Sequence, residues 1–367
     1  METVKIKDVT SHLESLAPGA YQESYDNSGL ITGNPDWPVN GILVTLDCIE
    51  IVVEEAIQQK CNLIIAHHPI VFKGLKRLTG KNYVEQTIIK AIKNDIAIYA
   101  IHTNLDNVHH GVNYKIAEKI GLSALEVLAP QSDTLSKLVT FMPKDSAPLV
   151  LDALHEAGAG NIGNYKNCSF RTTGTGTFEP TAEAKPHVGK AGKREEVKEI
   201  RAELIFPTVL ERQIITALKK SHPYEEVAYY LTSLDNKNEE VGSGMMGVLK
   251  TPIEPKAFLE RLKNRMNTAC IRHTALPDTH IQKVAICGGA GSFLLPLAKA
   301  KGADVFVSAD FKYHEFFDAE GQILIADIGH YESEQFTKDL LKEVLEEKFT
   351  TFAVYFSKSV TNPISYL

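Results

Sequence analysis

The chain has 367 residues, of which 44% are apolar and 23% are charged. This length corresponds to about two to three domains, and the composition is that of a globular protein and excludes a largely disordered chain. The formal net charge of −7 argues against a nucleic-acid partner bound through bulk positive charge.

Residues 1–130 alternate short apolar runs, which predict strands, with amphipathic runs, which predict helices. Strands separated by helices predict right-handed crossovers and a mainly parallel sheet. The predicted strands are GILVTLD (41–47), NLIIAHHP (62–69) and IAIYAIHTNLD (96–106), and the predicted helices are IEIVVEEAIQQK (49–60), VEQTIIKAIKND (84–95) and GVNYKIAEKIG (111–121).

The composition changes near residue 130, and residues 131–246 contain two halves of similar plan. Each half predicts a strand, a helix and a strand, which together indicate an α+β, ferredoxin-like unit. The first half is KLVTFMP, APLVLDALHEAG and CSFRTTGTGTF, and the second is EIRAELIFP, VLERQIITALKKSHP and EVAYYLTSL. The stretch 180–196 between them is rich in Pro, Gly, Ala and Lys, which predicts an exposed loop.

The first pattern returns in residues 247–367, with further apolar strands and a long predicted helix over 330–349. We therefore expect an α/β core, made of 1–130 and 247–367, that is interrupted by an α+β insert at 131–246. Three domains in a row remain the alternative.

The five cysteines are widely spaced and form no C-x-x-C pair, which predicts reduced thiols rather than a disulfide framework. The N-terminal stretch METVKIKDVTSHLESL lacks the apolar region of a secretory signal. No apolar run approaches the ~20 residues that a membrane-spanning helix needs. We expect a cytoplasmic protein that does not enter a membrane.

The adjacent pair His67 and His68 follows the predicted strand NLIIA. Ligands of α/β proteins bind at the carboxyl ends of strands, and neighbouring residues that leave a strand point in different directions. The two imidazoles could therefore serve two different metal ions. The alternative is an ordinary polar strand end in which one histidine caps backbone groups.

Three further side chains follow apolar strands in the same way. Asp106 ends the predicted strand 96–106, and His330 and Glu334 lie four residues apart at the start of the last helix, on one helix face. Each could be structural, Asp106 as a turn former and the other two as a helical pair. Taken together with the His pair, they form a set that suits two metal ions with Glu334 or Asp106 as the bridging carboxylate. Nitrogen and oxygen ligands suit zinc, manganese, iron or nickel.

His314 follows the predicted strand DVFVSAD and could act as a general acid or base, or cap the next helix. The segment ICGGAGSFLLPLAKAKG (286–302) predicts a strand, a glycine-rich turn and a helix. Such a turn could hold a phosphate at the helix N-terminus, or it could be a tight turn only.

Six segments, in this order, resemble the Nif-three-like family, whose members are often described as GTP cyclohydrolase I type-two homologues. The resemblance covers about 1–128 and 247–367. The segments are DNSGLITG (26–33), AHHPIVFKGLKRL (66–78), HTNLDN (102–107), GVN (111–113), SADFKYHEFFDA (308–319) and DIGHYESE (327–334).

The resemblance implies a dinuclear metal centre inside a toroidal homohexamer of α/β subunits. It carries the metal-binding role onto His67, His68, Asp106, His330 and Glu334, with zinc as the first choice of metal, and it favours a functional role for His314. The insert resembles the PII-like or CutA-like module of longer bacterial members, chiefly through HPYEEVAYYL (222–231).

Two functions follow as hypotheses. The first is a metal-dependent hydrolase that acts on a nucleotide or a related small molecule, in line with the GTP cyclohydrolase-like activity that the resemblance implies. The second is a metal-bearing regulatory or binding protein without turnover, whose insert senses a small ligand. Neither hypothesis requires nucleic acid or a membrane.

Overall fold

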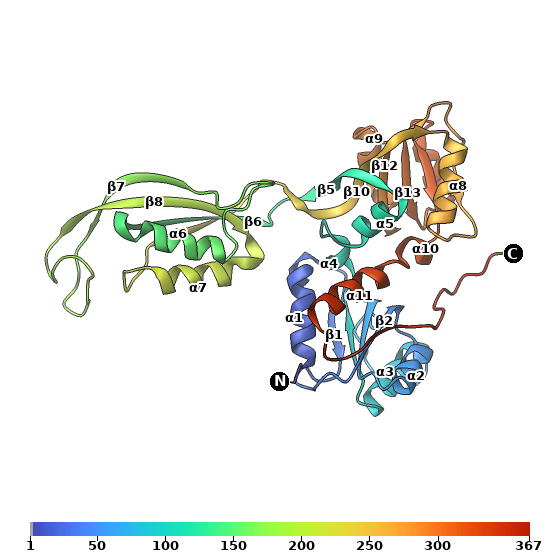
Figure 1. Cartoon of the computed structure of the whole chain (residues 1–367), viewed down its shortest axis with the longest axis horizontal. Coiled ribbons are helices and arrows are strands. Elements are labelled where there is room, and N and C mark those ends of the chain that lie inside the picture. The colour runs from blue at the N-terminus through green and yellow to red at the C-terminus, as the bar shows by residue number, and fades with distance from the viewer. Residues whose placement is uncertain (1–2) are drawn as a thin grey trace. The chain divides into compact units, whose positions relative to one another are not determined.

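The computed structural model describes residues 3–367 and divides the chain into two compact units (Figure 1). The first unit joins residues 3–130 to Glu240–Leu367, and the second unit is the contiguous segment Gln131–Glu239. The first unit contains two sheets and the second contains one.

The first sheet has five strands, of which the central ones are parallel and buried on both faces. All four residues of β4 and the first five of β3 are buried, as expected for parallel strands covered by helices on both sides. Strand β1 pairs antiparallel with β4 at one edge, and β15 pairs parallel with β2 at the other. In spatial order the strands are β1 (Gly29–Thr32), β4 (Ala97–Ala100), β3 (Leu63–His68), β2 (Ile42–Asp47) and β15 (Val354–Phe356).

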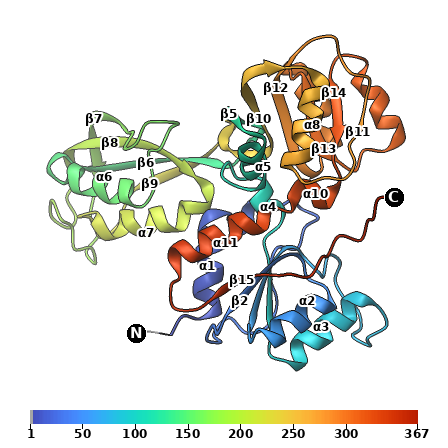
Figure 2. The same ribbon diagram turned by 45° about the vertical axis from the view of Figure 1, so that its right-hand side comes forward.

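Helices cover both faces of this sheet. On one face, apolar side chains of α2 and α3 pack against alternate residues of the strands, among them Leu43, Ile64 and Ile98. Helices α1 and α11 lie on the other side (Figure 2). Helix α3 begins after Asn82, whose side chain accepts a hydrogen bond from the backbone N–H of Glu85, an N-cap that satisfies one free donor of the first turn. The helices are α1 (Ile6–Leu16), α2 (Glu50–Gln58), α3 (Tyr83–Lys93) and α11 (Thr337–Lys348), with a 3-10 turn η1 at Gly19–Tyr21.

The second sheet of this unit has six strands. Strands β12, β13 and β14 are parallel, whereas β10 and β11 pair antiparallel with β12 and β14. In spatial order the strands are β11 (Arg272–His273), β14 (Leu324–Asp327), β13 (Val305–Ala309), β12 (Ile281–Ala290), β10 (Asn238–Ile253) and β5 (Leu122–Gln131).

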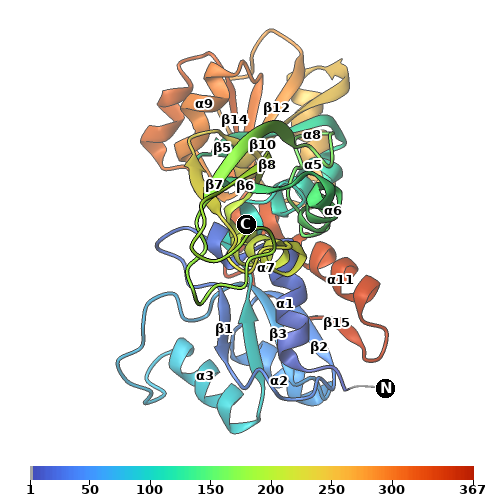
Figure 3. The same ribbon diagram turned by 90° about the vertical axis from the view of Figure 1, so that its left-hand side faces the viewer.

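Helices α8 and α9 lie on opposite faces of the second sheet (Figure 3). The apolar core on the α9 side combines Leu295 and Ala298 with strand residues such as Ala285, Phe306 and Ile325. The remaining elements of the first unit are α4 (Thr103–Asp106), α5 (Val112–Ile120), α8 (Pro255–Arg265), η4 (Ser292–Leu294), α9 (Leu295–Ala300), η5 (Tyr313–Ala319) and α10 (His330–Glu334).

The second unit is a four-stranded antiparallel sheet in the order β7-β8-β6-β9, with α6 and α7 on one face (Figures 1 and 2). The core under the helices contains alternate strand residues, for example Leu138, Leu204 and Phe206. The residues between them, such as Phe141 and Glu199, therefore point to the opposite face. The elements are β6 (Leu135–Pro143), η2 (Lys144–Ser146), α6 (Ala147–Glu156), β7 (Phe170–Phe178), β8 (Glu195–Pro207), η3 (Thr208–Leu210), α7 (Glu211–Ser221) and β9 (Tyr229–Leu234).

The elements differ from the sequence-based expectations in two places near the polar side chains described below. The strand predicted over 96–106 ends at Ala100, and Thr103–Asp106 instead form the helical turn α4. The helix predicted over 330–349 is broken into α10 and α11 around residues 335–336. Within the described part of the chain, no helix is both long enough and apolar enough to cross a bilayer.

Candidate metal centre

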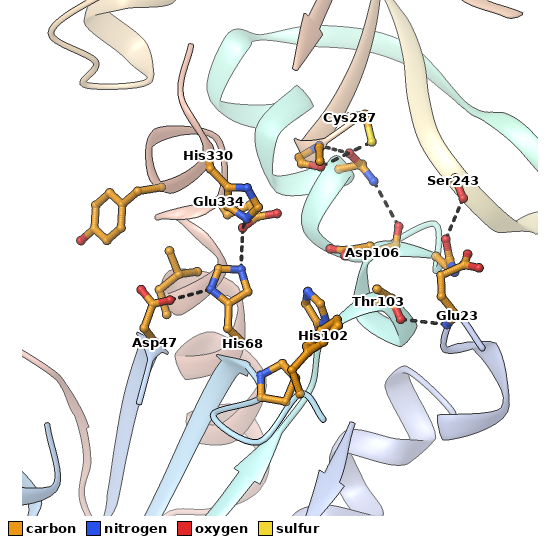
Figure 4. A pocket seen from close by; sticks show the side chains of 18 of the residues that line it. Glu23, Asp47, His68, His102, Thr103, Asp106, Ser243, Cys287, His330 and Glu334 are labelled. Carbon is orange, nitrogen blue, oxygen red and sulfur yellow. Dashed lines mark hydrogen bonds and ion pairs between the residues drawn. The ribbon is translucent and has the colours of Figure 1, made fainter. Parts of the chain in front are cut away.

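Histidine and carboxylate side chains from several segments of the first unit meet beyond the carboxyl edge of its first sheet (Figure 4). Asp47 ends β2 and lies beside His68 in the parallel register of β2 and β3. Asp106 ends α4, and His330 and Glu334 are the first and last residues of α10. Carboxyl ends of parallel strands meet at one edge, which explains why segments distant in sequence converge here.

The His67 side chain is fully buried, and one of its two ring nitrogens remains available as a ligand. Its Nδ1 lies 2.8 Å from the carbonyl oxygen of Ile101, and since a carbonyl only accepts, Nδ1 carries the proton. Burial lowers the pKa of His67 to about 3, so the ring is neutral near pH 7. Its Nε2 has no hydrogen-bond partner among residues 3–367 and presents a lone pair to Asp106 Oδ1 at 3.6 Å and to Glu334 Oε2 at 4.0 Å.

The other two imidazoles are each placed between two carboxylates. His68 lies 2.7 Å from Asp47 Oδ1 through Nδ1 and 2.9 Å from Glu334 Oε2 through Nε2. His330 lies 2.7 Å from Asp310 Oδ2 and 3.2 Å from Glu334 Oε2. Burial alone would lower the pKa of both rings, but these carboxylates raise it, to about 9 for His68 and about 11 for His330.

The two buried carboxylates behave in opposite ways. Burial would raise the pKa of Glu334, but the imidazoles of His330 and His68 hold it well below its usual range. Burial and the negative charge of Glu334 raise the pKa of Asp106 well above its usual range. Asp106 Oδ1 is also buried without a hydrogen-bond partner. A cation between these carboxylates would offset the repulsion that raises the pKa of Asp106.

Three overlapping groups of side chains have the spacing that a metal ion needs. The ligand atoms within each group lie within 4.8 Å of one another. Glu334 belongs to two of the groups, as a carboxylate shared between two ions would. The groups are His67, His68 and His102; His68, His330 and Glu334; and His67, Asp106 and Glu334.

All five side chains that the sequence singled out as metal ligands therefore lie together. His314 lies elsewhere: it is not among the residues that line this pocket, and its ring packs against Tyr313 and Phe317.

Three acidic residues lie around the cluster, and none of them was expected from the sequence to be a metal ligand. Asp47 and Asp310 orient His68 and His330, and Asp26 orients His102 through a 2.8 Å contact between Oδ1 and Nδ1. Asp310 has a left-handed backbone (φ +58°), which is uncommon outside glycine and marks functional or strained sites. Asp310 directly follows an apolar strand and Asp47 ends one. These positions are the feature by which the sequence could have pointed to both residues.

The glycine-rich end of β12 serves the site by close approach. Gly289 has φ +61°, and a Cβ there would lie 2.4 Å from Glu334 Oε1. Only glycine avoids both the strained backbone and the clash. The close approach of Glu334 to the backbone thus accounts for Gly289.

The cluster opens into a cleft of about 520 Å³. Aromatic side chains line part of it, among them Tyr25, Phe72 and Phe293, together with polar side chains such as Asn107 and Ser243. A cavity of this volume with few, convergent polar groups is typical of small-molecule sites.

The two sheets and the cluster between His67 and Glu334 define a mixed α/β protein with a candidate metal centre. The Duf34/NIF3 (NGG1p interacting factor 3) family model matches residues 4–363. The chain belongs to this family, which confirms the resemblance found in the sequence motifs.

Relatives match along the whole chain. A protein of Bacillus subtilis named "GTP cyclohydrolase 1 type 2 homolog" is 38% identical, and the match covers 100% of both chains. A homologue of the same name from Staphylococcus epidermidis is 38% identical over 99% of this chain and 100% of its own. Among solved structures, the Bacillus cereus protein related to NIF3 has a TM-score of 0.89 at 39% identity, and Staphylococcus aureus protein SA1388 has 0.79 at 30%, each with full coverage of both chains.

Proposed function

We propose that the protein is a dinuclear metal-dependent hydrolase that acts on a nucleotide or a related small molecule. The observation that carries this proposal is the pair of orphaned buried atoms, Nε2 of His67 and Oδ1 of Asp106, which face each other and Glu334. Buried polar atoms without partners are costly, and a cation would satisfy both at once.

The side chains would divide between two ions, with Glu334 as the shared carboxylate. His67 and Asp106 would hold one, and His68 and His330 the other. Asp47 and Asp310 would fix the orientation of the second pair of imidazoles, as carboxylates commonly do for metal-bound histidines. The nitrogen and oxygen donors fit zinc best among common cellular metals, with manganese, iron or nickel as alternatives.

Divalent ions bound here would supply a water-derived nucleophile near neutral pH. The chain itself supplies the shape of the cleft and the groups at its wall. The rings of Tyr25, Phe72 and Phe293 offer apolar faces for a planar base. His102, held by Asp26 and set edge-on to the rings of His67 and His68, is placed to accept or deliver a proton at its free Nε2. The name of the relatives suggests GTP as the first nucleotide to test.

Further features of the proposal concern assembly and location. We place the protein in the cytoplasm as a toroidal homohexamer, which the resemblance in the sequence motifs supports. Five unpaired cysteines among the described residues fit a reducing compartment. The strand order of the second unit supports a ferredoxin-like, PII- or CutA-like module. Nucleic acid and membranes are not proposed as partners.

A second candidate function is a metal-bearing binding protein without turnover. It is favoured by a separate cavity of about 530 Å³ that lies wholly within the second unit. Deletion of residues 131–239 would separate the two functions, since turnover that survives the deletion shows that catalysis does not require this unit.

The deciding experiment is elemental analysis of protein purified without chelator or nickel affinity resin. We expect about two transition-metal ions per chain in the native protein and loss of both in Glu334→Ala, because Glu334 is shared. Glu332→Gln is the matched control: Glu332 lies in the same short helix, is equally buried and binds Asn362 rather than the cluster. Native protein that holds no metal even after reloading would refute the proposal. Bound metal without hydrolysis of GTP or phosphoesters would leave the second candidate.

A further inference from the structure

The second unit contains a cavity on the face of its sheet that the helices leave uncovered. Phe141, Glu199 and Tyr230 contribute to it from β6, β8 and β9. The end of β7, the loop that follows it and the segment before β9 form the remaining walls, which include Gly176, Phe178, Glu179, His187, Tyr224 and Glu225.

The floor of this cavity carries a buried carboxylate that forms no ion pair with any residue of the described part of the chain. Glu199 is 8% exposed. Its Oε1 accepts a 2.9 Å hydrogen bond from the Tyr224 hydroxyl, and among the described residues no donor contacts Oε2. The neighbouring cationic side chains Arg201 of β8 and Lys137 of β6 are already paired, since both contact Glu203. A buried carboxylate is normally paired, so Glu199 lacks a cation.

The lining of the cavity excludes anions and favours positive charge. It contains four glutamates and no lysine or arginine. His222 lies behind the lining but supplies no charge, because burial lowers its pKa and its Nε2 donates to the carbonyl oxygen of Phe141. A phosphate or carboxylate ligand would find only the imidazole of His187 as a basic partner here, among four glutamates.

The walls around Glu199 are aromatic. The ring of Tyr224 lies 6.4 Å from that of Phe178 and 6.0 Å from that of His187, and the rings of Phe141 and Tyr230 are 5.6 Å apart. Aromatic faces attract organic cations, and quaternary and primary ammonium groups are recognised in such surroundings. The volume of about 530 Å³ far exceeds that of a bare metal ion and suits a small organic molecule.

The strand beside Glu199 is shaped for this carboxylate. Gly176 in β7 has no side chain, and a Cβ there would lie 2.1 Å from Glu199 Oε2. The glycine thus leaves room for the carboxylate to lie across β7 with Oε2 turned to the cavity.

We propose that this cavity binds an organic ammonium ion, with its nitrogen on Oε2 of Glu199 and its carbon skeleton between the aromatic side chains. This site lies apart from the metal cluster and does not depend on catalysis there. It also assigns a ligand of stated chemistry to the second unit.

Isothermal titration calorimetry on the full chain tests the proposal with benzylammonium and choline, beside benzyl alcohol and benzoate as neutral and anionic counterparts. We expect the cations to bind at least about tenfold more tightly than benzyl alcohol, and benzoate not to bind, given charge-assisted and cation–π contacts. Equal binding of the cation and the alcohol, or tighter binding of benzoate, would overturn the proposal.

Glu199→Gln keeps the size of the side chain and its acceptor for Tyr224 but removes the charge. We expect it to lower ammonium affinity at least about tenfold. Glu203→Gln is the control, since Glu203 lies on the same strand and face but outside the cavity. The ammonium affinity of this variant should stay within about twofold of the native value. If Glu199→Gln fails to fold, Tyr230→Leu replaces it, because Tyr230 is exposed and supplies one aromatic wall; an unchanged affinity there would count against the site.

A zinc titration of the Glu334→Gln protein tests whether the cavity binds an inorganic cation instead of an organic one. Zinc binding that depends on Glu199, without ammonium binding, would overturn the organic-cation proposal. Failure of the metal-centre proposal would leave these measurements unaffected.

Discussion

Both units bury a glutamate beside a cavity, but the surroundings of the two carboxylates differ. Glu334 is surrounded by imidazole nitrogens and a second carboxylate, whereas Glu199 is surrounded by phenol and phenyl rings. Nitrogen lone pairs at fixed spacing select a transition metal, and ring faces select a larger, weakly hydrated organic cation. If each site binds the cation proposed for it, the neighbours of a buried carboxylate, rather than the carboxylate itself, determine which cation it suits.

The largest effect is expected at the metal centre, where the affinity for metal should depend steeply on pH. Without a cation, the raised pKa values of about 9 for His68 and about 11 for His330 keep both rings protonated between pH 6 and pH 8. A metal must displace both protons, so the association constant should rise about 100-fold per pH unit, or about 10⁴-fold over this range. His67, with a pKa of about 3, releases no proton. Competition with a chromophoric chelator measures this slope, and a flat profile would contradict the assignment of the two imidazoles as ligands.

Removal of metal should destabilise the first unit and leave the second unchanged. A ligand present at about 1,000 times its dissociation constant stabilises the folded state by about 4 kcal/mol, or about 10³-fold in the folding equilibrium. Amide hydrogen exchange with and without chelator should therefore show faster exchange in β3 and α10 but not in β8. Chelator added to Glu334→Gln is the control and should have no effect. Equal loss of protection in both units would contradict the prediction that metal stabilises the first unit alone.

The smallest effect is expected from Gly176→Ala in the second unit. The added methyl group would meet Glu199 Oε2 and push the carboxylate away from the cavity floor, so benzylammonium affinity should fall about three- to tenfold. Gly174→Ala is the matched control, because a Cβ at this neighbouring position of β7 meets nothing within 4 Å. Calorimetry on both variants checks the prediction, and equal affinities would show that the position of Oε2 does not govern binding.

Much of the mixed α/β fold could be predicted from the sequence, because buried strands such as β3 and β13 are nearly continuous apolar runs. The periodicity does not report which strands pair, so it did not show that the first unit holds two separate sheets. The polar residues at the ends of the predicted strands were informative, since they located His67 and His68.

Other parts of the site depended on features that local sequence does not carry. Asp106 ends a helical turn rather than a strand, because His102 Nδ1 and the backbone N–H of Thr103 donate hydrogen bonds to the Asp26 carboxylate and fold the chain there. The contact between Asp310 and His330 depends on a left-handed backbone residue. Glu199 looked like an ordinary charge on an amphipathic strand, and only the loop over residues 179–188 makes it part of a cavity.

The pairing of β15 with β2 has a consequence for the order of events during synthesis. Residues near the C-terminus complete a sheet whose other strands come from the first hundred residues, and Glu334 joins the cluster from the same late part of the chain. The segment Gln131–Glu239 has all its strands in one stretch, so it can fold as soon as it leaves the ribosome. On a nascent chain the second unit would thus be formed first. The early strands of the first unit would remain exposed because their partners have not yet been translated.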